Sequence, residues 1–261
     1  MIFNIFKTAF FLSLLIQCSS TLQFQDNLFR KILEKNLNKN IMISPFSIYK
    51  VLSLILNGAI EDTQKEIFKA LFPDKEIELD DTFLKQINSN INQILLNIES
   101  ESNIDKSDNS KCKEDDCKIT FKDVCGIFNK EGELKENFIK VCDNYNTFYD
   151  ILISPEQIND FCSKNTEGKI NYVIGKIDLL TVLMIINPIY FKGTWVNKFE
   201  QYSTTKRSFL NSDNTIVKVD TMYKNYEENV NLYYEDNRVQ IIAIPYISNV
   251  LNFKMIIIKP N

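Results

Sequence analysis

Histidine is absent from this sequence of 261 residues. Its absence excludes the Ser-His-Asp and Cys-His catalytic arrangements, and it removes the commonest zinc ligand and the side chain that titrates near neutral pH. A hydrolase built on two carboxylates stays formally open, but 34 acidic residues without a motif do not indicate one. The sequence therefore predicts that the protein is not an enzyme, and nothing in it indicates a cofactor.

An excess of positive charge is also missing. The formal net charge is −4 and the isoelectric point is about 5.2, and lysines and acidic residues are interspersed along the chain. Nucleic acids and anionic membranes attract proteins through concentrated positive charge. We therefore expect no nucleic-acid partner and no attraction to an anionic membrane surface.

The amino-terminal apolar run is too short to cross a membrane, which takes about 20 residues. The run TAFFLSLLI, at 8–16, follows a short segment containing Lys7 and precedes the small or polar residues 17–20. A basic start, a short apolar core and small residues before a cleavage point are typical of a secretory signal peptide. We expect residues 1–20 to be this signal, residues 21–261 to form the mature domain, and the protein to be secreted and extracellular.

Cysteine is scarce, with six residues of which one lies inside the expected signal. The five that remain are an odd number, so a secreted chain would keep at least one free or intermolecular thiol. Cys112 and Cys117 flank the acidic loop KEDD and are candidates for a local disulfide. Cys125, Cys142 and Cys162 are expected to be small, buried, apolar residues.

Hydrophobic periodicity predicts an α+β domain in which most helices precede most strands. The expected helices are 22–39, 44–57, 63–72, 83–98, 134–145 and 154–168. The expected strands are 119–129, 147–153, 179–191, 215–222, 230–234, 239–245 and 252–258.

Several local signals position these elements. Ser44-Pro45 and Ser154-Pro155 each combine an N-cap serine with proline at the first helical position. Thr63 opens a capping box, TQKE. The body of the helix after Ser44 is apolar almost all round, which favours burial. The run LLTVLMIINPIYF at 179–191 is almost continuously apolar, which predicts a strand covered on both faces in the middle of a large sheet.

Three segments, in order, carry motifs of a known family. The first is NIMISPFSIYKVLSLILNGAIEDTQKEI at 40–67, and the second lies at 124–138 and contains IFNKEGELKENF. The third is NTEGKI from Asn165 followed by IINPIYFKGTWVNKF at 185–199, which contains the pattern Asn-x-Ile-Tyr-Phe-Lys-Gly-x-Trp. Together these segments resemble the serpin family, and the pattern in the third is close to a family signature. The resemblance continues through QIIAIPYISNVLNFKMIIIKPN, so it covers essentially the whole mature chain.

The resemblance implies a large mixed main sheet with two smaller sheets and several helices. Inhibitory members of the family offer a flexible loop to a serine or cysteine protease, and the cleaved loop inserts into the main sheet as an extra strand. By resemblance, Ser44, Ser47 and Asn187 form a shutter-like polar cluster under this sheet, and Trp195 lies where the loop first enters. An amide in an apolar strand must find hydrogen-bond partners or cost about 1–3 kcal/mol, and the two serines are candidate partners of Asn187.

Two features depart from the family pattern. The chain ends part-way through the resembling domain, so we expect the carboxy-terminal third, with its bait loop, to be missing. Pro188 stands where a small residue is usual and removes a backbone donor from the strand. We therefore expect a serine-type endopeptidase inhibitor by family that is not inhibitory as given, with a protease partner only if a full-length form exists. The alternative is a non-inhibitory binding or storage protein, and the chain alone is expected to be a monomer or an aggregation-prone fragment.

Overall fold

The structure is a computed structural model, and it describes residues 19–37, 39–75, 79–102, 119–130, 134–211, 213–224, 232–248 and 253–261. The helices are α1 (Ser19–Lys35), α2 (Pro45–Leu56), α3 (Glu61–Leu71), α4 (Asp81–Ser102), α5 (Glu136–Asn144), α6 (Pro155–Asn165) and the short 3-10 helix η2 (Gln201–Ser203). The strands are β1 (Thr120–Asp123), β2 (Cys125–Asn129), β3 (Thr147–Ile151), β4 (Leu183–Ile186), β5 (Ile189–Lys192), β6 (Thr205–Leu210), β7 (Ile216–Thr221), β8 (Leu232–Glu235), β9 (Val239–Pro245) and β10 (Lys254–Pro260).

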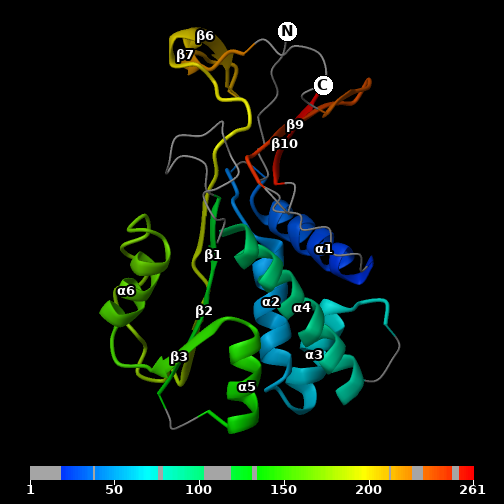
Figure 1. The fold of residues 1–261 in the computed structure, drawn as a ribbon, viewed down its shortest axis with the longest axis vertical. Coiled ribbons are helices and arrows are strands. Elements are labelled where there is room, and N and C mark those ends of the chain that lie inside the picture. Colours follow the sequence, from blue (N-terminus) through cyan, green and yellow to red (C-terminus); the bar gives the residue numbers. More distant parts are fainter. Residues whose placement is uncertain are drawn as a thin grey trace.

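The architecture confirms the expected α+β fold. What we call the main sheet consists of the three-stranded sheet β3-β2-β4 and the two-stranded pair β1-β5, which continues two of its strands along the chain. Helices α1 to α5 lie on one side of it and α6 on the other (Figure 1). The main sheet is mixed, because β2 pairs in parallel with β3 and antiparallel with β4. Two smaller antiparallel sheets, β6-β7 and β8-β9-β10, lie at the opposite end of the molecule from α3 and α5.

The main sheet contains one long antiparallel pair of chain segments. Strand β1 pairs with β5, and β2, which follows β1 directly, pairs with β4. Asp123 pairs with Ile189, and Gly126 pairs with Ile186. The number of residues from Asp123 to Gly126 therefore equals the number from Ile186 to Ile189. The segments 120–129 and 183–192 therefore run side by side without an inserted residue, and their ladder is interrupted only around Pro188.

The prediction of a single strand at 179–191 in the middle of the sheet is wrong in two respects. The strand is broken at Asn187-Pro188, because proline has no N–H to donate to a ladder, and residues 179–181 form a turn in which Leu179 and Leu180 are each 88% exposed. In the described part of the chain, β4 pairs only with β2, so the central strand is β2. A continuous apolar run indicates that both faces are covered, but it does not indicate neighbours along both edges.

The covering of both faces is confirmed. Residues alternate along β2 and β4, so that Ile127 and Ile185 pack with the helices on one face. On the other face Phe128 and Met184 pack with Ile158 of α6. These two apolar layers fix the sheet between α6 and the helices α2, α3, α4 and α5.

The helix caps were predicted with mixed success. Ser44 and Ser154 cap α2 and α6, and each accepts a hydrogen bond from the backbone N–H three residues further on, as predicted. The capping box at Thr63 is wrong, because α3 already begins at Glu61 and its N-cap residue, Ile60, makes no side-chain cap bond. The local signal at Thr63 therefore lies inside the helix.

One strand was missed. Strand β6 pairs with β7 along its full length, from Thr205 opposite Thr221 to Leu210 opposite Ile216. Its sequence, TKRSFL, is mostly polar and exposed, so it carries no alternation of apolar and polar residues that would predict a strand. The two small sheets were otherwise anticipated by the strands predicted after residue 215.

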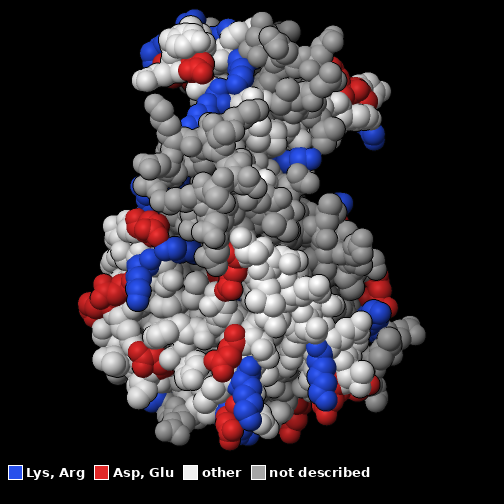
Figure 2. Space-filling model, in the orientation of Figure 1, with Lys and Arg blue, Asp and Glu red and all other residues white. Residues whose placement is uncertain are grey.

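Cys125, Cys142 and Cys162 are buried and free, as expected. Cys112, Cys117 and residues 1–18 lie outside the described residues, so the proposed disulfide and the signal peptide stay predictions. Lysine, arginine and acidic side chains are interspersed over the helical part of the visible face, in line with the mixed charge along the sequence (Figure 2).

Candidate functional site: a buried polar cluster under the main sheet

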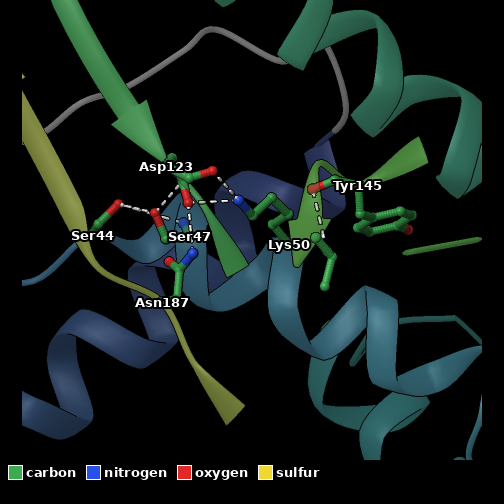
Figure 3. Close-up of polar contacts among 7 residues, drawn as sticks. Ser44, Ser47, Lys50, Asp123, Tyr145 and Asn187 are labelled. Carbon is green, nitrogen blue, oxygen red and sulfur yellow. Dashed lines mark hydrogen bonds and ion pairs between the residues drawn. The ribbon is translucent and has the colours of Figure 1, made fainter. Parts of the chain in front are cut away.

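The three residues singled out by resemblance, Ser44, Ser47 and Asn187, lie together with Lys50 and Asp123 (Figure 3). We call these five residues the polar cluster. Ser44 is the N-cap residue of α2, and the helix supplies Ser47 from its first turn and Lys50 from its second; residues three apart on a helix share a face. Asp123 is the last residue of β1, and Asn187 occupies the break between β4 and β5.

The carboxylate of Asp123 is the centre of the polar cluster. Its Oδ2 accepts from Ser47 Oγ at 2.8 Å, and Ser47 Oγ lies 2.8 Å from Ser44 Oγ. Its Oδ1 accepts from Lys50 Nζ at 2.6 Å and from Asn187 Nδ2 at 2.8 Å. Lys50 Nζ also donates to the backbone oxygen of Asp123 at 2.8 Å, so the lysine binds both the side chain and the main chain of β1.

Lys50 and Asp123 form a buried ion pair, with side chains 1% and 2% exposed. Sequence reasoning missed both residues. A signal for one of them was present, because a lysine in a helix that is otherwise apolar all round needs a partner for its charge. The sequence does not say which of the 34 acidic residues supplies that partner.

The polar cluster lies between two apolar layers. Along α2 it is flanked by Phe46 and Leu54, which belong to two different clusters of buried side chains. Along the main sheet, Phe121 and Ile127 flank Asp123 in the same way. These layers exclude water, and the low local dielectric strengthens each hydrogen bond while raising the cost of any polar atom left unpaired.

Asn187 finds its partner through Asp123 and not directly through the serines. Its amide nitrogen donates to Asp123, whereas Ser47 reaches the other oxygen of the same carboxylate. Among the described residues, Asn187 Oδ1 and Ser53 Oγ are buried without a hydrogen-bond partner. The predicted direct contact between Asn187 and the serines is therefore wrong, although all three meet at one carboxylate.

Two thiols lie in the apolar layer below the polar cluster. Burial raises the pKa of Cys125 to about 11, and the nearby charge of Lys50 opposes the shift without cancelling it. Burial also raises the pKa of Cys142 to about 11. Both thiols are therefore protonated at neutral pH, which makes them poor nucleophiles.

Trp195 lies just beyond the end of β5, apart from the carboxylate centre. It forms a single bridge with Tyr246, and the two rings stack with centroids 4.2 Å apart and planes at 17°. Tyr246 also meets Phe191 edge-on, at 5.0 Å between centroids. This aromatic contact joins the end of the main sheet to the end of β9, and the role of Trp195 in loop entry stays a prediction.

Two further features were searched for in the described part of the chain. None of its helices is both long and apolar enough to cross a membrane. Within the same residues, no group of three histidine, cysteine or acidic side chains is placed to hold a metal ion.

Solved structures with the same architecture define the class of fold. AtSerpin1 of Arabidopsis, in its native stressed conformation, superimposes with a TM-score of 0.72 over 92% of this chain and 59% of its own, at 22% sequence identity. The model of the family described as serpin (serine protease inhibitor) matches residues 19–261. The chain therefore belongs to the serpin family.

The chain spans about half the length of the curated relatives it matches. It is 28% identical over 238 residues to Serine protease inhibitor A3F of Mus musculus, covering 88% of this chain and 50% of that protein. It is 32% identical over 225 residues to Iripin-4 of Ixodes ricinus, covering 82% of this chain and 55% of that protein.

Proposed function

We propose that this protein is a secreted serpin whose main sheet inhibits a serine protease by accepting an additional strand along the segment 183–192. The observation that carries the proposal is the interrupted ladder at Asn187-Pro188, which lies beside the buried polar cluster centred on Asp123. Adding a strand to a sheet requires strands to part and to form new backbone hydrogen bonds, and an interrupted ladder has fewer bonds to break. The family match and the name of the mouse relative support the protease as the target class.

In this proposal the polar cluster has a conformational role. Ser47 and Asn187 donate to Asp123, and Ser44 bonds to Ser47, so movement of the strands that carry Asp123 and Asn187 changes these hydrogen bonds. Pro188 removes one donor from the segment 183–192, which costs an added strand about 0.5–1.5 kcal/mol if that donor faces it. Trp195, at the end of β5, would meet the incoming strand first.

The test incubates the longest product of the gene that encodes this chain with a trypsin-like, a chymotrypsin-like and a papain-like protease. We expect this product to form, with a serine protease, a stoichiometric complex that survives a denaturing gel. Simple degradation of the product by all three proteases would contradict the proposal and would favour a binding or storage protein.

Secretion is tested separately. Cleavage after Ser20 would remove only the first two residues of α1, so the folded domain would stay intact. Expression with the native amino terminus in a secreting host should place the protein in the medium, with Thr21 as its first residue. Retention inside the cell with Met1 intact would contradict this part of the proposal.

A further inference from the structure

We propose that the buried pair Lys50–Asp123 is a latch that fixes the position of the main sheet on α2 and so sets the resistance to strand movement. The purpose of the latch rests on the proposed function, because strand addition requires the main sheet to move. Its existence can be measured without a protease. The two residues are positioning residues, since they act through the sheet and contact no substrate.

The contacts of the pair are directional and converge on one residue of the sheet. Lys50 Nζ donates to Asp123 Oδ1 at 2.6 Å and to the backbone oxygen of Asp123 at 2.8 Å. Ser47, one turn earlier on α2, donates to Oδ2 at 2.8 Å. Three bonds from two residues of one rigid helix therefore fix both the side chain and the main chain at the end of β1.

The surrounding contacts between α2 and the sheet cannot fix a position in this way. Phe46 and Leu54 of α2 pack in apolar clusters with Phe121 and Ile127 of the sheet. Apolar burial depends on area and not on direction, so it changes little when two surfaces slide by a small distance. A hydrogen bond weakens steeply with distance and angle. The polar contacts therefore determine where the sheet rests along α2.

The latch lies at the point where the backbone hydrogen bonding of the main sheet is interrupted. Asp123 ends β1, and the facing segment is interrupted at Pro188, so the backbone ladder between 120–129 and 183–192 is broken there. Asn187, beside the break, is tied to the latch through its bond to Asp123 Oδ1 at 2.8 Å. The carboxylate thus holds both segments to α2 at the point where their own ladder is interrupted.

Stability alone does not account for a charge pair at this place. Desolvating two charges offsets most of their attraction, and apolar replacements of buried ion pairs are often neutral or stabilising. The pair is 1% and 2% exposed, so this cost applies in full. Unlike an apolar contact, the ion pair fixes the position of the main sheet on α2. The effect of removing this constraint can be measured.

The test removes both charges, keeps most of the packing and retains one of the hydrogen bonds to the side chain of residue 123. In the double variant Lys50→Met/Asp123→Asn, the methionine retains the length of the lysine stem and the new amide still accepts from Ser47 or Asn187. Amide hydrogen exchange is measured on the full chain, at a concentration where size-exclusion chromatography shows a monomer. We expect an unchanged or higher unfolding midpoint, but exchange in 120–129 and 183–192 that is faster by about tenfold or more.

The matched control is the exposed pair Lys206–Asp220 of the β6-β7 hairpin, whose side chains are 66% and 67% exposed. The double variant Lys206→Met/Asp220→Asn should leave exchange in the main sheet unchanged.

A folded Lys50→Met/Asp123→Asn protein with unchanged exchange in both segments overturns the latch. Failure of that variant to fold, seen as loss of its far-ultraviolet circular dichroism, also overturns it, because the pair would then be needed for folding itself. Loss of the proposed function would show as no protease complex from the longer gene product, with the exchange result unaffected.

Discussion

At the scale of single residues, the Asp123 carboxylate is the group on which the polar cluster depends. Removing it leaves the ammonium of Lys50 buried without a counter-charge, which typically costs about 3–5 kcal/mol. We expect Asp123→Ala to lower the free energy of unfolding by this amount in urea titrations. Fluorescence of Trp195, the single tryptophan, reports the transition. The variant Asp220→Ala, which breaks an exposed pair, should cost about 1 kcal/mol or less. Equal losses in the two variants would contradict the role of Asp123.

The buried thiols predict a loss of stability in alkali. Burial raises the pKa of Cys125 to about 11, above the value near 9 expected in the unfolded chain. The unfolded state therefore releases its proton first, so the stabilising contribution is complete below about pH 9 and is lost as the pH rises to about 11. The loss from Cys125 amounts to at most about 2–3 kcal/mol. It is measured as the difference in pH dependence between the wild type and Cys125→Ala, and identical profiles would contradict it.

Residue-scale features could be predicted where they are local. Ser44 as an N-cap can be inferred from Ser-Pro at the start of an apolar run, because the cap bond spans three residues. The contact between Lys50 and Asp123 spans 73 residues of sequence. No local pattern encodes it, and only the folded sheet brings the two charges together. The site was therefore predicted in part, through resemblance, and its central carboxylate was missed.

At the scale of elements, α6 and the loop after it behave as one unit. The side chain of Asn159 donates to the backbone oxygen of Ile174 at 2.8 Å and accepts from the backbone N–H of Val173 at 2.7 Å and of Ile174 at 3.1 Å. These bonds hold the loop against the helix that covers the outer face of the main sheet. Without them the loop loses its attachment, while Ile158 of α6 keeps its apolar contacts with the sheet.

We therefore expect Asn159→Ala to lower the free energy of unfolding by about 1–3 kcal/mol and to expose residues 172–178 to proteases. Limited proteolysis with mass spectrometry of the fragments measures the second effect. The matched control is Asn165→Ala, since Asn165 makes a single bond, within α6, to the backbone oxygen of Phe161 at 2.8 Å. Cleavage of the loop at the same rate in both variants would show that Asn159 does not hold it.

Element prediction succeeded where a local signal or a short apolar run marks the element. The expected and observed bounds of α2 agree closely because Ser44-Pro45 marks its start. The bounds of β9 and β10 agree with prediction to within two residues because each contains a short apolar run of strand length. Predictions failed where the deciding information is not periodic. Pro188 broke a strand that hydrophobicity alone makes continuous, and the polar strand β6 owes its conformation to pairing with β7.

At the scale of the whole molecule, the resemblance supplied what periodicity could not. Alternation and apolar runs predict strands, but not which strands pair or in which order. The resemblance carried by the three segments predicted a mixed main sheet with two smaller ones, and the structure has this arrangement. The order β3-β2-β4 places β4 at an edge among the described residues, and this order depends on which segments are present to pair.

That edge predicts self-association of the 261-residue chain. Along β4 the backbone pairs on one side only among the described residues, and Leu183 is 49% exposed, so the edge can add a strand from a second copy. We expect the mass measured by light scattering after size-exclusion chromatography to rise with protein concentration. A lysine at an edge opposes such pairing, so Leu183→Lys should require a severalfold higher concentration for the same mass.

The control is Leu179→Lys, because Leu179 is 88% exposed but lies in the preceding turn, where a charge cannot block the edge. A wild type that stays monomeric at all concentrations, or equal effects of the two lysines, would show that β4 is not the associating edge.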